Sequence, residues 1–490
     1  MRARRARHTS WHMPSACLCV LAAACVGPNF KTPPPPQVTR YTSGELPQQT
    51  VAAEGAAGAA QKFLADADVP RNWWTQFGSA ELNELVMQAL RANPQILSAQ
   101  AALRQAQENT AAQRGSYFPL VQGGFDATRN RDPTGVLQPT LASGTTVYNL
   151  YTPQVTVSYT PDIFGANRRQ VESLAAQAEA QRFQLDATYL TLTANVVTAA
   201  IQDAGLRAQI SATQRVIALE QQSLDVLKRE FELGAVAEAD VYAVEAALAQ
   251  LQATLPPLDR QLEITRDQLA VLTGRMPADY KPLSLQLEQI TLPENLPLGV
   301  PSQLVERRPD VRAAEAQLHA ATANVGVAIA DLLPQITITG DIGSTASLMS
   351  ELFKAGTGFW NLGANGTLTL LDGGSGYHHV RAADAALDQA GADYKTAVLT
   401  AFQNVADALH ALDTDAQALE AASRAENAAQ KSLGVTRRQL ELGSVSYVSL
   451  LLGEQAYQQA LISSIQARAN RLEDTAALFQ ALGGSIAPPR

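Results

Sequence analysis

The chain has 490 residues and a formal net charge of −9, from 37 basic and 46 acidic side chains. An acidic balance of this size argues against a protein that binds nucleic acid or an anionic membrane surface. Aromatic residues make up only 6% of the chain, and its richness in Ala and Gln suits long, closely packed helices better than a globular enzyme.

The first 24 residues predict export. Arg2, Arg4, Arg5 and Arg7 precede a short apolar run at 17–24 that ends in small residues, which is the pattern of a cleaved secretory signal. Cleavage removes these four positive charges and takes the net charge from −9 to −13. No apolar stretch reaches the roughly 18 residues that a spanning helix needs, so a membrane crossing would have to be made by a barrel.

Cys25 is a candidate lipidation site. It ends the sequence LAAAC, which resembles a bacterial lipoprotein box. The alternative is a structural or disulfide cysteine, but Cys17 and Cys19 leave with the signal and Cys25 would then be unpaired in an oxidising compartment. Val26 rather than Asp follows, which by resemblance to lipoprotein sorting rules implies the outer membrane.

A duplication organises the rest of the chain. Residues 92–122 align with 307–337 at an offset of 215, the tripeptide ELG at 232–234 recurs at 441–443, and Gly274 aligns with Gly484. A period this long indicates a duplicated half-protein rather than a short solenoid repeat. The predicted organisation is a signal peptide (1–24), a lipidated N-terminal segment (25–71), a first repeat (72–277), a linker (278–299), a second repeat (300–484) and a C-terminal tail (485–490).

Each repeat predicts one very long helix. Residues 167–255 and 377–487 contain no proline, and a helix over 166–233 would be on the order of 100 Å long. Each long helix ends at ELG, where glycine can close a helix C-terminus, and return helices are expected at 238–254 and 447–482, the first broken by Pro256 and Pro257. The expected coiled-coil seams, with a spacing of seven, are Ile210, Ile217, Leu224 and Phe231, and Leu412, Leu419, Leu433 and Leu440, interrupted by Glu426.

Four segments predict strands. Residues 118–129, 151–162, 334–344 and 359–372 alternate large or apolar residues with small or polar ones. Each is near the roughly 9–11 residues of a tilted membrane strand. Four strands cannot close a barrel around water, so either the chain oligomerises or the strands form a soluble hairpin cap. The expected lipid anchor favours the first alternative.

Searches for catalytic residues yield none. GGSG at 373–376 lacks the context of a nucleophile elbow, and His378 and His379, being adjacent, face different ways on a helix. Arg307 and Arg308, beside Glu306, are interpreted as packing or capping groups, and Trp73 and Trp74 as a packing anchor. No catalytic residue, cofactor or metal ligand is therefore expected.

Five blocks of sequence, in order, resemble the TolC/NodT-type outer-membrane efflux lipoproteins. They are CVGPNFKTP from Cys25, NWWTQFGSAELNELVMQALRANP from Asn72, VPSQLVERRPDVRAAEAQL from Val300, LTLLDGG from Leu368 and TAFQNVADAL from Thr400. The resemblance implies a mainly α protein with a transmembrane β-barrel portion: duplicated long helical hairpins and four strands per chain, assembled as a homotrimer with a 12-stranded barrel and a periplasmic α-helical tunnel.

The resemblance also implies a function and partners. The expected function is a passive exit duct for small molecules in a tripartite efflux pump, with a periplasmic adaptor protein, an inner-membrane RND-type transporter and outer-membrane lipid as partners. Two alternatives stay open: the exit channel of a type I protein secretion system, and a lipid-anchored coiled-coil scaffold without a pore.

The functional positions are expected at the hairpin tips. Small residues there are the candidate adaptor-docking positions: Gly234, Ala235, Val236, Gly443, Ser444 and Val445. In the family, acidic residues six and nine places after the tip glycine ring the periplasmic mouth, followed by a basic residue. Asp240 matches this pattern, whereas Ser449, Leu452 and Gln455 depart from it, so the candidate gate is only half acidic.

Two of the gate positions, Asp240 and Leu452, have an alternative interpretation. Asp240 can be a first-turn acid favoured by the helix dipole. Leu452 can close the pore as a hydrophobic constriction or pack as an ordinary seam residue. Whether Glu454 faces inward is left open.

Overall fold

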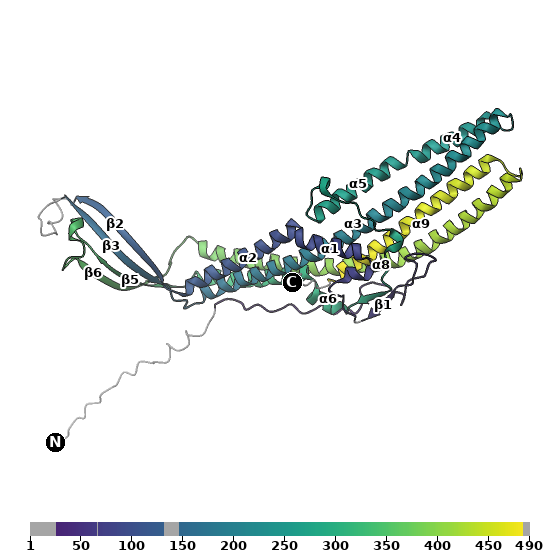
Figure 1. Cartoon of the computed structure of the whole chain (residues 1–490). Coiled ribbons are helices and arrows are strands. Elements are labelled where there is room, and N and C mark those ends of the chain that lie inside the picture. Colours follow the sequence, from purple (N-terminus) through teal and green to yellow (C-terminus); the bar gives the residue numbers. More distant parts are fainter. Residues whose placement is uncertain (1–25, 66, 132–146, 484–490) are drawn as a thin grey trace, which may run out of the picture. The chain divides into compact units, whose positions relative to one another are not determined.

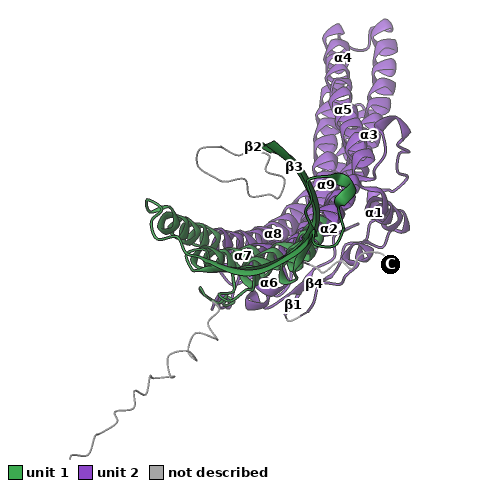
Figure 2. Cartoon of the chain, turned by 90° about the vertical axis from the view of Figure 1, so that its left-hand side faces the viewer, with its two compact units in different colours: residues 1–32, 105–178, 316–392 green, residues 33–104, 179–315, 393–490 purple. Residues whose placement is uncertain are grey.

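The computed structural model describes residues 26–65, 67–131 and 147–483. Cys25, the signal peptide, Gly484 and the tail at 485–490 lie outside the described residues. The chain forms two compact units (Figure 2). Unit 1 comprises Met1–Thr32, Gln105–Ala178 and Ala316–Ala392, and unit 2 comprises Pro33–Arg104, Glu179–Glu315 and Asp393–Arg490.

The elements follow the duplicated order of the sequence (Figure 1). The α-helices are α1 (Ala80–Ala92), α2 (Pro94–Arg114), α3 (Ala166–Glu232), α4 (Glu238–Gln252), α5 (Leu255–Leu272), α6 (Pro301–Arg307), α7 (Pro309–Ala330), α8 (Ser375–Glu441) and α9 (Tyr447–Ala481). The strands are β1 (Lys62–Ala65), β2 (Leu120–Arg131), β3 (Val147–Tyr159), β4 (Asn295–Leu298), β5 (Gln335–Ser344) and β6 (Gly358–Thr367). Short 3-10 helices lie at Trp73–Phe77, Gly115–Tyr117, Pro277–Asp279, Leu287–Gln289 and Met349–Glu351.

The two long helices confirm the duplication. Both α3 and α8 have 67 residues, and their first and last residues are offset by 209 positions. Pro256 and Pro257 occupy the first turn of α5, just after α4 ends, because proline is tolerated only where the helix N–H groups lack partners anyway. The second return helix, α9, has no such break and continues for 35 residues.

Two details of the repeat bear on the prediction. Gly274 and Gly483 have matching left-handed φ angles of 72° and 73°, at the offset of 209 that the long helices share, whereas Gly484 lies outside the described residues. In the seams, Leu412, Leu419 and Leu433 are buried as expected, but Phe231 is 41% exposed. Phe231 lies in the last turn of α3, at the hairpin tip.

Unit 1 contains an antiparallel sheet in the order β2-β3-β5-β6. These are the four predicted strands, with shifted ends. The last strand is shorter than expected, because it stops at Thr367 and residues 368–372 are not part of it. Asp372 instead accepts hydrogen bonds from the backbone N–H groups of Gly374 (2.8 Å) and Gly376 (2.6 Å) at the start of α8, as a helix N-terminus favours.

Unit 2 contains a strand pair that the sequence analysis missed. The four-residue strands β1 and β4 pair in parallel, with Lys62 opposite Asn295 and Ala65 opposite Leu298. Neither strand shows the alternation of a half-buried strand over a sufficient length to be recognised.

Residues 26–30, the first described residues of unit 1, contact α3 and α7. Arg169 of α3 is 4% exposed, and its guanidinium donates to the carbonyls of Val26 (3.2 Å) and Gly27 (3.4 Å) and to Asn29 Oδ1 (2.7 Å). Phe30 stacks on His319 of α7, with ring centroids 4.4 Å apart. The N-terminal strap, residues 26–30, is therefore held by both halves of the duplication.

A fully buried arginine organises the segment that carries β1. Arg471 of α9 is 0% exposed. Its guanidinium donates to Thr50 Oγ1 (2.9 Å), Gln61 Oε1 (3.3 Å) and the carbonyls of Ala57 (3.0 Å) and Ala59 (2.9 Å). A buried cation is tolerated only when hydrogen bonds replace its hydration, and here four acceptors from residues 50–61 surround it. The contact ties this segment to α9 within unit 2.

We predict that Arg471→Met destabilises the protein by roughly 2–4 kcal/mol, because Gln61 Oε1 and the carbonyls of Ala57 and Ala59 lose this donor, and Thr50 Oγ1 keeps only the N–H of Gln61. Thermal unfolding of the purified protein in detergent checks this, together with protease cleavage between residues 45 and 65. The control is Arg424→Met, since Arg424 is 74% exposed and pairs only with Glu420 on its own helix. Equal melting temperatures for the two variants would contradict the assigned role of Arg471.

Candidate functional site: the two-faced sheet and the hairpin tips

The sheet of unit 1 has one predominantly apolar face and one predominantly polar face. Strand register places Val155, Ile342 and Trp360 side by side in one row across the sheet. Val157 and Leu362, each two residues further along its strand, lie on the same face in the neighbouring row. The alternate rows are polar, because successive side chains of a strand point to opposite faces. The central polar row consists of Gln122, Thr156, Asp341 and Asn361.

The apolar face is open to its surroundings in the single chain. Trp360 is 78% exposed, Leu362 71% and Ile342 65%. A contiguous apolar surface of this kind marks a surface that contacts another protein or a membrane. With polar residues on the opposite face, the pattern is that of a strand layer between lipid and water.

Both edges of this sheet are unpaired. The outer edges of β2 and β6 have no neighbouring strand among the described residues. An edge strand presents a row of N–H and C=O groups that can pair with another chain. Inside a bilayer such edges cannot stay open, because no water is present to satisfy them.

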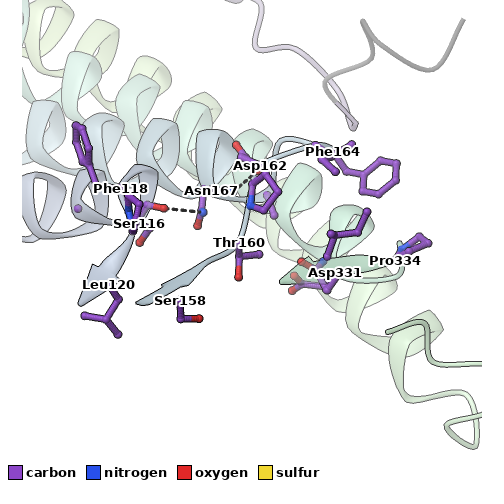
Figure 3. A pocket seen from close by; sticks show the side chains of 17 residues that line it. Ser116, Phe118, Leu120, Ser158, Thr160, Asp162, Phe164, Asn167, Asp331 and Pro334 are labelled. Carbon is purple, nitrogen blue, oxygen red and sulfur yellow. Dashed lines mark hydrogen bonds between the residues drawn. The ribbon is translucent and has the colours of Figure 1, made fainter. Parts of the chain in front are cut away.

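A cavity of about 680 Å³ lies in unit 1 at the base of the sheet (Figure 3). Its polar groups are used in capping and loop contacts: Asp162 accepts from the backbone N–H groups of Asn167 (3.0 Å) and Arg168 (2.8 Å) at the start of α3. Asn167 in turn donates to the carbonyl of Ser116 at 3.5 Å. Asp162 thus plays the part that Asp372 plays at α8, and the cavity presents no nucleophile with an adjacent base.

The hairpin tips of unit 2 have the same backbone in both repeats. Gly234 and Gly443 have φ angles of 75° and 72°, a conformation that glycine adopts without strain. The N–H of Ala235 donates to Glu230 O at 2.8 Å, and that of Ser444 to Gln439 O at 2.9 Å. Each tip therefore ends its long helix with a Schellman-type closure.

The candidate docking residues lie at these turns. Ala235 and Ser444 are exposed, as are the two tip glycines, whereas Val236 and Val445 are half-buried. Leu233 and Leu442 beside them are 84% and 78% exposed. The sequence analysis did not single out these two leucines, although their position in ELG was visible.

The candidate gate residues on α9 share one face. Ser449, Leu452 and Gln455 follow each other at intervals of three, and Leu452 is 61% exposed. Leu450, Leu451 and Glu454 between them are buried. Leu452 is therefore not part of the hydrophobic core of its own chain. Asp240 is half-buried in the first turn of α4.

A buried acidic pair was missed by the sequence analysis. Glu220 of α3 and Glu454 of α9 are 3% and 4% exposed within unit 2. Burial, together with the charge of Glu454 and a hydrogen bond to it, raises the pKa of Glu220 to about 7. The sequence did carry a signal for the burial of Glu220. It lies seven residues after Thr213 and seven before Leu227, and both of these residues are buried on α3.

The other residues considered in the sequence analysis lie in structural settings. Trp73 is buried and stacks on Phe479, with ring centroids 5.4 Å apart. Arg308 is buried and donates to the carbonyl of Ala481 at 2.8 Å, and Arg307 pairs with Asp68. His378 and His379 are exposed. Across the described ranges, no three His, Cys, Asp or Glu side chains are grouped to hold a metal ion.

No helix within residues 26–65, 67–131 or 147–483 combines the length and the apolar character that a bilayer crossing requires.

Relatives resemble the chain over almost its whole length. The pyoverdine export outer membrane protein OpmQ of Pseudomonas putida is 28% identical over 470 residues, which cover 96% of this chain and 97% of that protein. The toluene efflux pump outer membrane protein TtgF of Pseudomonas putida is 28% identical over 481 residues, covering 96% of each. Nodulation protein T of Rhizobium leguminosarum is 25% identical and covers 98% of this chain and 97% of that protein.

Solved structures agree with the fold. The outer-membrane channel OprN has a TM-score of 0.83 and 27% identity, covering 94% of this chain and 99% of that one. The open state of the Neisseria gonorrhoeae MtrE outer membrane channel has a TM-score of 0.77 and 25% identity, covering 94% and 99%. These likenesses confirm the predicted fold class, with long helical hairpins and a four-stranded sheet in each chain.

The family model of outer membrane efflux proteins matches residues 85–275 and 300–484, one match in each half of the duplication. Together these matches cover most of the chain. The protein belongs to the outer membrane efflux protein family.

Proposed function

We propose that this protein is the outer-membrane exit channel of a tripartite efflux pump. One observation carries the proposal: a four-stranded sheet with an apolar face, a polar face and two open edges, in a chain whose helices have 67 residues. The sheet fits a membrane, and the helices have the length to cross a periplasm. Family membership and the efflux and export relatives support the same function.

Three copies of the chain would complete the channel. Eight strands make a barrel just wide enough for its interior to be filled by side chains, and water-filled channels need more. Twelve strands, four from each of three copies, leave room for solutes, with β2 of one copy pairing with β6 of the next. The polar row of Gln122, Thr156, Asp341 and Asn361 then faces the lumen, and Trp360 and Leu362 face lipid.

The duct itself would be passive. In this proposal an inner-membrane transporter of the RND type supplies the energy, and a periplasmic adaptor protein joins it to the hairpin tips. The names of the relatives OpmQ and TtgF refer to pyoverdine and toluene, which supports small molecules as cargo over the proteins of a type I secretion system.

A lipid anchor at Cys25 would assist insertion. The N-terminal strap directly after Cys25 is held by Arg169 and His319 within unit 1, the unit that also contains the sheet. Acyl chains add about 0.8 kcal/mol of membrane affinity per buried methylene. We expect the intact mass of the mature chain to show an acylated N-terminus at Cys25; an unmodified N-terminus at any other residue would contradict the anchor.

Closure of the periplasmic mouth is proposed to depend on Leu452 and Asp240. Because Leu452 lies outside its own chain's core, three leucines can meet near the axis of a trimer and exclude water from the pore. Ser449 and Gln455 on the same face add neutral polar groups. Such a gate is less sensitive to salt than a ring of carboxylates, whose interactions are screened within about 10 Å at 0.1 M ionic strength.

We predict that the protein conducts ions in a planar bilayer, and that Leu452→Gly and Asp240→Ala both raise the basal conductance. The larger increase is expected for Leu452→Gly, because it removes the hydrophobic constriction. Ala243→Gly is the matched control, since Ala243 is the exposed residue at the equivalent position of the first hairpin. A protein that never conducts would contradict the channel, whereas unchanged conductance with a lower melting temperature would assign Leu452 to packing.

We predict that Ala235→Glu and Ser444→Glu abolish efflux-dependent resistance while the oligomer still forms. A large charged side chain at either turn prevents the close approach of an adaptor's helices, which small residues permit. Inhibitory concentrations of efflux substrates in cells lacking the native channel measure the effect, and native electrophoresis measures assembly. Ala249→Glu, at an exposed site of α4 away from the turn, serves as control. Normal resistance in both tip variants would place docking elsewhere.

A further inference from the structure

Two buried carboxyl groups join the two hairpins of unit 2. Glu220 lies on α3, the long helix of the first hairpin, and Glu454 on α9, the return helix of the second. Both are almost fully buried. Leu224, one turn after Glu220, and Leu451, one turn before Glu454, belong to one core cluster, which brings these parts of α3 and α9 together. Glu220 is 12 residues before the end of α3, roughly 18 Å from its last residue along the helix, so the pair is close to the tips.

The two acids have different surroundings. Arg437 of α8 donates to Glu454 Oε1 at 3.0 Å, so the charge of Glu454 has a partner. Among the described side chains no cation bonds Glu220, and its Oε2 has no hydrogen-bond partner. A buried carboxylate without a partner is costly, and a buried acid in this position favours its neutral form.

The first hairpin supplies an internal comparison. Lys228 and Glu245 occupy the positions equivalent to Arg437 and Glu454, at the shared offset of 209, and they too form an ion pair, at 3.8 Å. That pair is about half exposed. The position equivalent to Glu220 is Ala429. The Arg437–Glu454 pair therefore has a further buried carboxyl group beside it, that of Glu220. The equivalent position in the other half of the duplication is an alanine.

Two other ion pairs of unit 2 involve the same hairpins. Glu426 of α8 pairs with Arg468 of α9 at 3.4 Å, and Lys228 and Glu245 pair on the surface of the first hairpin. From α4, the core beside the pair receives the apolar side chains Val241, Val244 and Leu248, which pack with Leu224, Leu227 and Leu451. Ionisation of Glu220 would therefore place a second negative charge beside Glu454 in an apolar setting.

We propose that Glu220 and Glu454 form a proton-dependent latch between the two hairpins of one chain. With its proton, Glu220 donates an O–H hydrogen bond to the Glu454 carboxylate and holds α3 against α9. Without the proton, two negative charges face each other in a buried contact and the hairpins separate. The link to the pore depends on the proposed function, because separation of the hairpins near their tips would widen the periplasmic mouth.

The direction of the pH dependence follows from the raised pKa. The folded contact binds the proton of Glu220 with a pKa of about 7, against an ordinary value of 4.5. Stabilisation of the closed hairpins is therefore complete below about pH 4.5, weakens as the pH rises, and is lost above about pH 7.

Hydrogen exchange measured by mass spectrometry tests the latch directly on the purified full-length protein. After correction for the intrinsic rate, we expect amides at 217–227 and 448–458 to exchange roughly tenfold or more faster at pH 8.5 than at pH 5.5. In Glu220→Gln the difference should vanish, because the amide donates to Glu454 at every pH. In Glu454→Gln the transition should move to lower pH, because the charge that disfavours ionisation of Glu220 is gone.

The duplicated ion pair gives the control. Glu245→Gln removes an equivalent carboxylate without touching the buried pair, and it should leave the pH dependence intact. A transition that persists in Glu220→Gln, or that is absent from the wild-type protein between pH 5.5 and 8.5, would overturn the latch.

Conductance separates this proposal from the proposed function. If exchange shows the transition and the bilayer current rises over the same pH range, the latch controls the mouth. If exchange shows the transition but the protein does not conduct, the latch stands and the channel function fails. If the protein conducts without either transition, the channel stands and the latch fails.

Discussion

The structure depends on one constraint: backbone hydrogen-bonding groups at the edges of a sheet must be satisfied before that sheet can lie in a membrane. Strands β2 and β6 leave such groups open, and no described residue of the chain covers the apolar face between them. The chain therefore cannot insert its sheet alone. Pairing with further copies removes the edges. The number of copies then sets the width of the pore and the number of helical hairpins in the assembly.

The duplication explains how one chain contributes two similar hairpins, and its divergence indicates where regulation resides. Both tips close through glycine with the same hydrogen bonds, so the surface that we propose for adaptor docking is repeated. Behind the tips the halves differ. Glu245 is about half exposed, whereas its counterpart Glu454 is buried beside Glu220. Equal tips and unequal interiors allow one hairpin to move against the other without changing what the adaptor contacts.

Much of the fold could be predicted, because its signals are local. The lack of proline and the ELG ends define the long helices, and the alternating segments define the four strands of unit 1. The pair β1–β4 could not be predicted, since it joins four-residue segments more than 200 positions apart and depends on the network around Arg471.

The candidate site was predicted less completely. The tip residues follow from the glycine turns, but the surroundings of Glu454 depend on which side of α9 packs against α3. That orientation is set by tertiary packing, which places Leu452 outside and Glu454 inside, two residues apart. The spacing along α3 indicates that Glu220 is buried, but its pairing with Glu454 appears only when helices of different hairpins are brought together in space.

The claim that three copies pool their strands is tested most directly by native mass spectrometry of the mature protein released from mild detergent. The account predicts a complex of three chains that stays intact for as long as detergent covers the apolar face of the sheet. A stable monomer that inserts into bilayers and conducts ions would contradict it, because one chain would then have satisfied both sheet edges without a partner.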